Sequence, residues 1–328
     1  MREEAPEGVK VSSQLSYYKH DRGIEVKAGG QTFQVTSDRL PFRRVVMLNA
    51  SLIGYLEALG VENRIVGVSS PEYIFSDRLR KRLAEGAIQE VGNEQKYDVE
   101  KILALKPDVV LTNYIPTFEA TYDLLRSSGV PIIFLNEYME QNPLEKSKYL
   151  LLFGVLFDKK AEAEKLYAEI ESRYNALKAK ARQAKTKPVV LANEMYGGQW
   201  FMPGGRTQLA LFLSDAGADY ILKDDRSDRS VPMTFEEVLI QSAGASFWVN
   251  VGAHQSRKSL LAVNPVYEKL AVFRNGKLYA MSGRQKGKAN DFFEMGNVRS
   301  DLVLRDYVKI FHPDLVPADS LVFMKPIN

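Results

Sequence analysis

The sequence predicts an α/β protein built from two similar lobes with parallel sheets, bridged by one long rigid α-helix, with a small N-terminal β element. Short strands that are apolar on both faces alternate with amphipathic helices over residues 41–157, and the same alternation resumes after Pro188. Strands buried on both faces are typical of parallel sheets covered by helices. Between the two halves, residues 158–186 contain no glycine or proline, and apolar side chains recur at helical spacing from Leu166 to Leu177. Such a stretch predicts a single bridging helix.

The N-terminal part of the chain divides into two expected segments. Residues 1–16 are polar without periodicity, so we expect a tether. Residues 17–40 are expected to form a β-hairpin appendage, because the alternating runs Ile24–Lys27 and Thr32–Val35 flank a glycine turn.

The first lobe is expected to span residues 41–157. Its apolar run Tyr149–Phe157 is far shorter than the roughly 20 residues that a membrane-spanning helix needs, so we expect a buried helix there. The remaining patterns predict four strands (Arg44–Leu48, Ile65–Val68, Asp108–Leu111 and Val130–Leu135) and three helices (Ile53–Leu59, Val99–Leu105 and Thr121–Arg126).

The second lobe, residues 187–328, partly repeats the first. The segment Ile53–Val66 is similar to Leu209–Leu222, and Glu100–Leu111 is similar to Glu236–Val249. The repetition predicts two related lobes, and a cleft between lobes is a common place for a ligand.

Composition excludes several function classes. The chain has 328 residues, with 44 basic and 41 acidic side chains and a net charge of +3, which argues against a nucleic-acid binder held by bulk charge. Cysteine is absent, so thiolate metal sites, iron–sulfur clusters and cysteine nucleophiles are excluded. With only His20, His254 and His312 as imidazoles, we predict no resident metal site.

Motifs for catalysis are also missing. The sequence has no GxSxG elbow and no GxGxxG after a strand, and Gly283–Lys288 differs from a phosphate loop in spacing. We therefore predict that the protein is not an enzyme. Two alternatives stay open: a transferase or hydrolase on a two-lobed α/β scaffold, because fold alone never excludes catalysis, and a chelatase-like metal-insertion protein.

Three phrases resemble one known family. They are Asp98–Val110 (DVEKILALKPDVV), Asp291–Glu294 (DFFE) followed by Arg299, and the closing segment Leu304–Pro313. The chain resembles, over about residues 40–316, the periplasmic substrate-binding proteins of ABC importers for iron complexes (siderophore or haem) and cobalamin, which have the class III binding-protein fold. The tripeptide Ser-Pro-Arg of the cobalamin-binding members is replaced here by Asn297-Val298-Arg299, so its proline is lost.

The resemblance implies a function. It implies capture of a metal chelate (ferric siderophore, haem or cobalamin/corrinoid) in the inter-lobe cleft and delivery to an ABC permease with its ATPase, by a monomer without cofactor. It also implies a periplasmic or cell-envelope lipoprotein, membrane-associated only through a lipid anchor. The first residues have no apolar core typical of a signal peptide, which fits a cytosolic protein or a mature form without its leader.

The resemblance further implies two acidic residues that dock on the permease, one on each lobe. Glu119 stands at the place expected in the first lobe, although a carboxylate at a helix start is also favoured by the helix dipole. In the second lobe Arg206 stands where the acid is expected. Docking there would differ or would use a neighbour such as Asp215.

Ligand-binding residues are predicted at the carboxyl ends of the parallel strands, where α/β proteins bind ligands. A flat chelate needs aromatic faces and a few polar anchors, and the Trp200 and Phe292 rings are the leading candidates. If the ligand were haem or ferric, His254 or a tyrosine could ligate the metal, and Arg284, Lys286 and Lys288 could neutralise its carboxylates or form a solvated loop. The predicted set is Asn49, Ser51, Tyr73, Phe75, Asn113, Tyr114, Tyr196, Trp200, His254, Arg284, Asn290, Asp291, Phe292 and Phe293.

Overall fold

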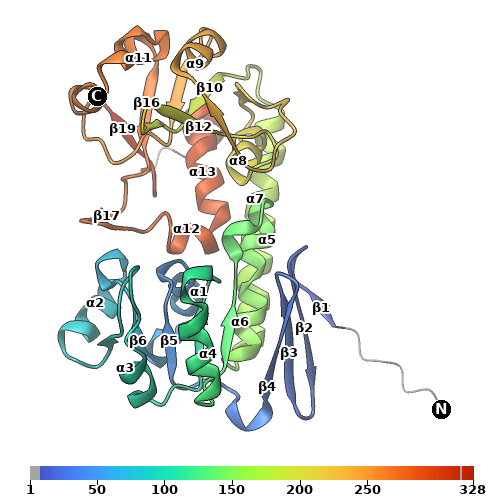
Figure 1. The fold of residues 1–328 in the computed structure, drawn as a ribbon. Helices are drawn as coiled ribbons and strands as arrows, with labels where there is room; N and C mark the ends of the chain where they lie inside the picture. Colours follow the sequence, from blue (N-terminus) through green and yellow to red (C-terminus); the bar gives the residue numbers. More distant parts are fainter. Residues whose placement is uncertain (1–7, 318–319) are drawn as a thin grey trace. The chain divides into compact units, whose positions relative to one another are not determined.

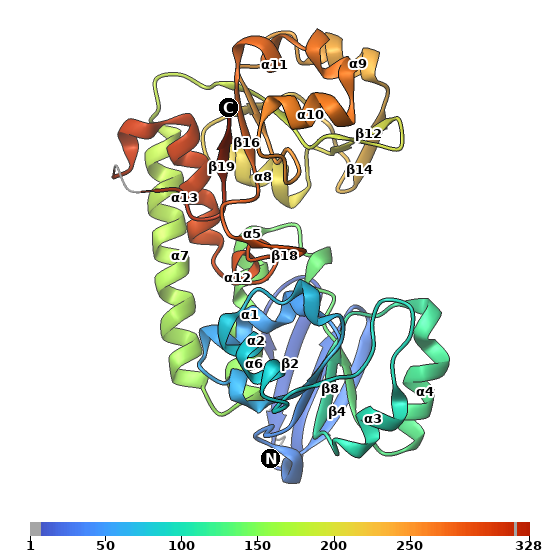
Figure 2. The same cartoon turned by 90° about the vertical axis from the view of Figure 1, so that its left-hand side faces the viewer.

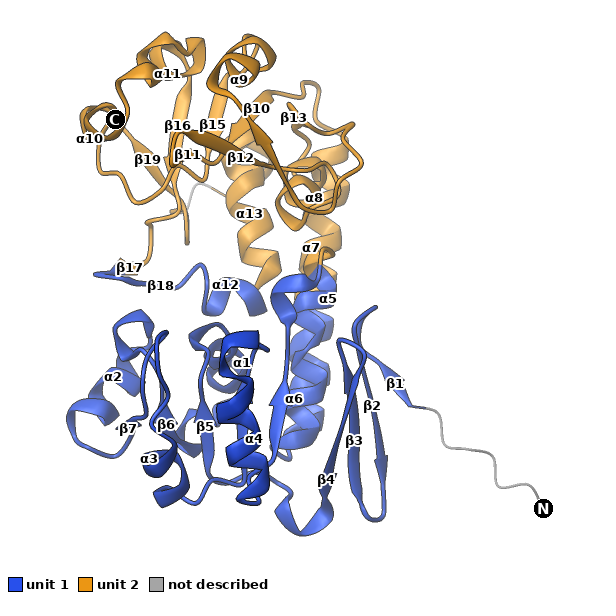
Figure 3. Ribbon diagram, viewed as in Figure 1, with its two compact units in different colours: residues 1–140, 144–169, 286–298 blue, residues 141–143, 170–285, 299–328 orange. Residues whose placement is uncertain are grey.

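The computed structural model describes residues 8–317 and 320–328, which group into two compact units (Figures 1 and 3). Unit 1 contains the residues up to Glu140, Leu144–Glu169 and Lys286–Val298. Unit 2 contains Gln141–Pro143, Ile170–Gln285 and the residues from Arg299 on.

Unit 1 carries a four-stranded antiparallel sheet at its N-terminal side, in the order β1-β2-β3-β4. Its strands are β1 (Val9–Lys10), β2 (Leu15–His20), β3 (Gly23–Ala28) and β4 (Gln31–Thr36). The predicted N-terminal β element is thus confirmed. Residues 9–16 of the expected tether take part in this sheet, because Val11 and Leu15 are buried, and residues 1–7 lie outside the described part.

The main sheet of unit 1 is parallel and has the order β7-β6-β5-β8-β9. It consists of β5 (Val45–Met47), β6 (Ile65–Val68), β7 (Gln89–Glu90), β8 (Val109–Thr112) and β9 (Ile132–Phe134). Every residue of β5, β8 and β9 is buried, as the doubly apolar strand pattern predicts.

Helices cover both faces of this sheet (Figure 2). The helices α3 (Val99–Ala104) and α4 (Glu119–Ser127) pack on one face, where Ile102 and Leu125 join a core cluster with Val110 of β8. On the other face, α1 (Ile53–Ala58) lies against α6 (Leu150–Leu156), and the ring of Tyr55 stacks on Phe153 at a centroid distance of 4.8 Å. The expected buried helix at Tyr149–Phe157 is confirmed by α6. Further helices are α2 (Asp77–Ala84), α5 (Pro143–Lys148) and α12 (Met295–Val298).

The long helix is α7, which runs over Lys160–Arg182. Its 23 residues correspond to about 35 Å, and residues of α7 belong to both units. The predicted long helix between two α/β halves is confirmed.

Unit 2 has a second sheet in the order β13-β10-β15-β16-β19. Its parallel strands are β10 (Val189–Ala192), β13 (Asp219–Tyr220), β15 (Phe247–Val249) and β16 (Lys277–Ala280), and β19 (Lys325–Ile327) joins antiparallel. The helices of this unit are α8 (Gln208–Asp215), α9 (Phe235–Gln241), α10 (Arg257–Val263), α11 (Ala271–Asn275) and α13 (Ser300–Phe311). His312 forms the C-cap of α13.

Two small antiparallel ladders complete the fold. In unit 2, β11 (Met195–Tyr196), β12 (Gln199–Pro203) and β14 (Ser230–Met233) form a three-stranded sheet. Just before α12, β17 (Gln285–Lys286) pairs with β18 (Ala289–Asn290), which belongs to unit 1. None of the helices in the described part of the chain combines the length and apolar character needed to cross a bilayer.

Candidate ligand-binding site

A cavity of about 540 Å³ opens in unit 1 where three neighbouring parallel strands end. The strands β6, β5 and β8 are adjacent in the sheet, and they are followed by Ser69, Asn49 and Asn113. All three side chains therefore reach the same edge of the sheet, as the strand-end rule predicts. The lining residues are Leu48, Asn49, Ala50, Ser51, Ser69, Ser70, Tyr73, Glu94, Tyr97, Thr112, Asn113, Tyr114, Ile115, Phe118, Tyr138, Lys288, Asn290, Phe293 and Glu294.

The walls of this cavity are rich in aromatic rings. Two of them, Tyr138 and Phe293, are 55% and 53% exposed, so they present ring surface to the solvent. The rings of Tyr97 and Phe118 pack together with a centroid distance of 4.2 Å. Tyr114 lies edge-on to Phe134 of β9 at 5.2 Å, which fixes its ring at the cavity wall. Such rings can cover the apolar faces of a flat ligand.

The polar floor of the cavity is organised by one buried carboxylate, Glu137. Ser51 donates a hydrogen bond from Oγ to Glu137 Oε1 at 2.5 Å, and the Ser51 backbone N–H donates to Asn49 Oδ1 at 2.9 Å. With its amide nitrogen turned toward the acceptors, Asn113 donates to Glu137 Oε2 at 3.1 Å and accepts from Asn49 Nδ2 at 2.6 Å. Glu137 thereby holds the Ser51 hydroxyl and the Asn113 amide directly, and Asn113 in turn holds the amide of Asn49.

The charge of Glu137 is countered from within unit 1. Burial raises the pKa of Glu137, and the nearby ammonium of Lys146 together with the Ser51 hydroxyl opposes that rise. Burial also lowers the pKa of Lys146, which Glu137 and Glu140 oppose. Lys146 therefore offsets part of the cost of burying the Glu137 carboxylate.

One wall comes from a segment that lies far along the chain, residues 286–298. Lys286 pairs with Asp77 at 2.5 Å and lies 4.3 Å from the ring centroid of Phe75. Lys288 pairs with Glu72 at 3.7 Å and lies 5.5 Å from the ring centroid of Tyr73. Both lysines of the segment are thus matched by acids that follow β6.

Glu294 anchors the same wall. Its carboxyl oxygens accept hydrogen bonds from the backbone N–H of Phe75 at 2.8 Å and of Ser76 at 3.2 Å. The carboxyl group of Glu57 on α1 forms a hydrogen bond with that of Glu294, and Ser76 Oγ donates to Glu57. Burial raises the pKa of Glu294 to about 8, and the neighbouring carboxyl of Glu57 adds to this rise.

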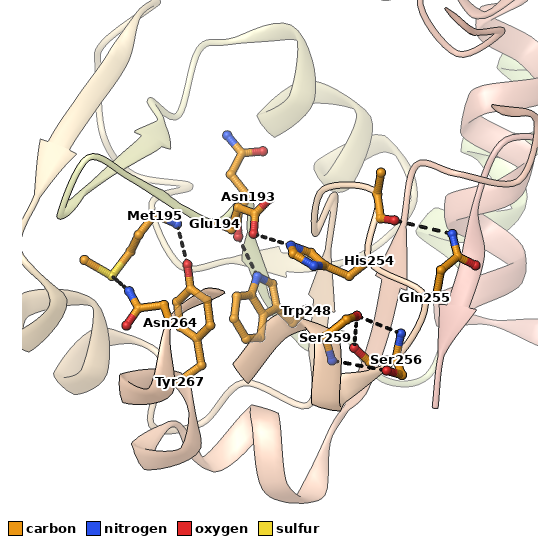
Figure 4. A network of polar contacts seen from close by, with 11 residues as sticks. Asn193, Glu194, Met195, Trp248, His254, Gln255, Ser256, Ser259, Asn264 and Tyr267 are labelled. Carbon is orange, nitrogen blue, oxygen red and sulfur yellow. Dashed lines mark hydrogen bonds and ion pairs between the residues drawn. The ribbon is translucent and has the colours of Figure 1, made fainter. Parts of the chain in front are cut away.

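Unit 2 holds a separate polar network at the carboxyl ends of β10 and β15 (Figure 4). His254 Nε2 lies 2.7 Å from Glu194 Oε2, and Trp248 Nε1 donates to the carbonyl of Asn193 at 2.6 Å. Asn193 has a left-handed backbone with a φ of 58°, which is uncommon for a residue other than glycine. The turn after β10 is therefore tightly fixed by this network.

The structure places the predicted ligand-binding residues of unit 1 in two groups. Those that line the cavity are Asn49, Ser51, Tyr73, Asn113, Tyr114, Asn290 and Phe293. Phe75 and Asp291 are buried behind the wall, where the Asp291 carboxylate accepts from the Met295 N–H at 3.3 Å. Phe292 packs edge-on against Phe293 at 5.3 Å.

The predicted residues of unit 2 have other surroundings. Trp200 was expected on a loop but lies on β12, where it is 0% exposed and donates from Nε1 to the carbonyl of Ala192 at 3.1 Å. Its ring packs against Trp248 and Tyr267, so it presents no face to a ligand in this structure. Tyr196 is 80% exposed at the β11–β12 turn, and Arg284 is exposed ahead of β17.

The two predicted docking positions lie on the surfaces of their units. Glu119 begins α4 and forms an ion pair with Arg126 at 3.3 Å. Arg206 is exposed between β12 and α8. Asp215 is held inside unit 2 by Lys178 at 2.8 Å and by the hydroxyl of Tyr174 at 2.7 Å. Of these two candidates in unit 2, Arg206 is therefore the exposed one.

Several cavity residues escaped the sequence prediction. Tyr138 follows β9, so applying the strand-end rule to that strand as well would have found it. Tyr97 and Phe118 precede helices, and Glu137 lies beneath the floor, so no periodic signal marks them. Among the residues that the structure describes, no group of three or more histidine or acidic side chains could hold a metal ion.

Comparison with known proteins agrees with this geometry. The model of the periplasmic binding protein family matches residues 45–284, which is most of the chain. The chain belongs to this family. Members of the family are binding proteins, and the cavity at the strand ends is the kind of feature through which a binding protein holds a solute.

Individual relatives are distant. An uncharacterized lipoprotein of Methanocaldococcus jannaschii is 25% identical over 297 residues, which cover 87% of this chain and 68% of that protein. A periplasmic haem-binding protein of Pseudomonas aeruginosa shares the fold with a TM-score of 0.63 and 20% identity, over 88% of this chain and 98% of that one. A protein of an ABC-type Fe³⁺-hydroxamate transport system from Saccharomonospora viridis has a TM-score of 0.61 and 20% identity, over 86% and 97% of the two chains.

Proposed function

We propose that this protein is the solute-binding component of an ABC importer and that it captures a metal chelate for delivery to a membrane permease. The observation that carries the proposal is the cavity of unit 1, with aromatic walls and an amide floor at the ends of β5, β6 and β8. The candidate cargoes are a ferric siderophore, haem or a corrinoid. Relatives of the same fold named for haem binding and Fe³⁺-hydroxamate transport support this range.

Capture would need no covalent step. Exposed rings such as Phe293 and Tyr138 would cover the apolar faces of the chelate, and the amides of Asn49 and Asn113 would hydrogen-bond to its rim. Because Glu137 already holds these amides in place, little side-chain freedom would be lost on binding. The metal remains part of the cargo, and no resident cofactor is proposed.

Delivery would use the surfaces of both units. We assign Glu119 at the start of α4 to the permease contact of unit 1 and the exposed Arg206 region to that of unit 2. An ATPase on the far side of the membrane would drive uptake. The lipoprotein among the relatives supports a place in the cell envelope, with a lipid anchor as the link to the membrane.

The proposal predicts that Phe293→Ala weakens chelate binding. Removing an exposed ring that covers the ligand should cost about tenfold or more in affinity, because burying a large side chain contributes about 1.5–3 kcal/mol. Isothermal titration of the full chain with ferric siderophores, haem and cyanocobalamin measures this effect.

The matched control is Phe201→Ala on β12, which removes a similarly exposed phenylalanine that does not line the cavity. This variant should bind each of these chelates like the unchanged protein. Failure of every chelate to bind would contradict the proposed function. Equal losses in the two variants would contradict the cavity as the site.

A further inference from the structure

Among the described residues that line the unit 1 cavity, no positive charge lacks an acidic partner, and this limits what the cavity can hold. Among the described residues that line it, Lys288 is the one cation, and Glu94 and Glu294 are the carboxyl groups. Lys288 lies 3.7 Å from Glu72, so the two together add no net charge even if an incoming ligand rearranges them. A polyanionic chelate would therefore find no compensating positive charge.

Glu294 contributes a hydrogen-bonded carboxyl that is nearly fully buried. Two carboxyl groups can hydrogen-bond to each other only if one proton lies between them, and Glu57 and Glu294 are in such a contact. The acids around the pair are Glu62, which is ion-paired with Arg78 at 2.8 Å, and Asp291. Both add negative potential and so favour retention of the shared proton.

The remaining polar groups of the cavity are uncharged. Asn49, Asn113 and Asn290 offer amides, and Ser51, Ser69 and Thr112 offer hydroxyls. Amides both donate and accept hydrogen bonds, so they match a ligand rim that carries carbonyl oxygens and N–H groups.

We propose that the unit 1 cavity selects uncharged metal chelates with amide or hydroxamate groups on their rim and discriminates against polyanionic chelates. This inference rests on the proposed function and narrows it to a ligand class. An uncharged ferric trihydroxamate and a corrinoid share this chemistry. Haem, with two propionates, and ferric tris-catecholates, with three negative charges, do not.

Titration calorimetry of the full chain at pH 7 tests the charge preference. The uncharged probes are ferrioxamine E and cyanocobalamin. Comparing the two distinguishes a hydroxamate ligand from a corrinoid ligand. The anionic probes are haem and a ferric tris-catecholate. We expect at least one uncharged probe to bind about tenfold or more tightly than both anionic probes. The reason is that an anionic probe would bring negative charge into a partly buried site that has no unpaired positive charge to balance it.

A pair of variants makes the test specific to charge. Glu72→Gln leaves the Lys288 charge unbalanced at the cavity and should strengthen binding of the tris-catecholate about tenfold, with little change for ferrioxamine E or cyanocobalamin. The matched control is Asp77→Asn, which leaves Lys286 unbalanced outside the cavity lining and should change anion affinity much less.

The proton shared by Glu57 and Glu294 gives a second readout. Above about pH 8 this proton is lost, and an uncharged ligand would then have to cover two carboxylate charges in place of one. Binding of the preferred chelate should weaken from pH 7 to pH 9 in the unchanged protein and stay constant in Glu294→Gln.

The outcomes separate this inference from the function on which it rests. Tighter binding of haem or the tris-catecholate than of both uncharged probes would overturn the inference and leave the proposed function standing. Binding of none of the four probes would overturn both.

Discussion

At the scale of single residues, Glu294 links the cavity wall to the interior of unit 1. Its oxygens accept from two backbone N–H groups, and its contact with Glu57 requires a proton. Because burial raises the pKa of Glu294 to about 8, the folded protein holds this proton over a range in which the unfolded chain has lost it. Its protonation therefore couples the stability of unit 1 to pH.

This coupling predicts that stability falls as pH rises from about 5 to 8, because the folded state then binds more protons than the unfolded state. The slope is at most about 1.4 kcal/mol per pH unit for one proton. In Glu294→Gln this contribution is absent, so the unchanged protein should lose stability relative to the variant over this range. Urea unfolding followed by circular dichroism at pH 5, 6.5 and 8 measures the difference.

The partner variant checks the origin of the effect. Glu57→Gln supplies an amide N–H to Glu294 in place of the shared proton and should reduce the pH dependence without abolishing it, because burial is the larger cause of the raised pKa of Glu294. The free energies of unfolding of the unchanged protein and of Glu294→Gln are compared at the three pH values. If their difference is the same at all three, the shared proton is contradicted.

The sequence predicts the position of a site residue where that residue closely follows a buried strand. Asn49 and Asn113 follow recognisable buried strands, so the sequence located them in the cavity. Trp200 shows where this rule fails. The sequence does not distinguish a tryptophan on a loop after a strand from one on a further buried strand, and Trp200 lies on such a strand. Glu137 could not be predicted at all, since its importance arises from side chains brought to it by three separate segments.

At the scale of elements, the wall depends on close packing of α1 against the segment that includes α12. Gly54 of α1 lies against the backbone of Glu294, where a Cβ atom would fall well inside van der Waals contact with the Glu294 carbonyl. Glycine at this position lets the two backbones approach, and the wall that carries Phe293 and Glu294 depends on that approach.

We predict that Gly54→Ala destabilises the protein by about 1–3 kcal/mol, because the added methyl group forces the backbones apart. It should also weaken chelate binding by displacing Phe293. Urea unfolding and calorimetry measure the two effects. The control Gly244→Ala adds a methyl group where no atom lies within 4 Å, so it should be nearly neutral. Equal stability of Gly54→Ala and the unchanged protein would contradict this account of the wall.

The main strands of unit 1 were predictable because each is a short, doubly apolar run between turns, and β5, β6, β8 and β9 match their predicted ranges closely. The hairpin β11–β12 was not predicted. Its strands are short and its residues alternate between buried and exposed only once the sheet with β14 has formed, so local sequence carried too little signal.

At the scale of the whole molecule, each of the two compact units is made of several separate stretches of the chain. The sequence assigned residues 286–298 to the second lobe because they are contiguous with it, whereas their contacts group them with unit 1. The ion pairs of Lys286 and Lys288 and the hydrogen bonds of Glu294 produce this grouping. These contacts join positions more than 200 residues apart, which periodicity cannot reveal.

The near balance of 44 basic and 41 acidic residues has a local counterpart at the cavity, where Lys288 is paired with Glu72. A chain that binds through rings and amides needs no strong field of its own. Family membership implies a bound solute, and the proposed preference for uncharged chelates rests on a lining without unpaired positive charge.

The central claim, that the unit 1 cavity holds the chelate, is tested most directly by hydrogen–deuterium exchange of the full chain with and without the chelate that binds most tightly. The account predicts slower exchange at backbone amides of residues 49–51, 69–73, 113–118 and 288–294, which line the cavity. Unchanged exchange in all four segments at saturating chelate would contradict it.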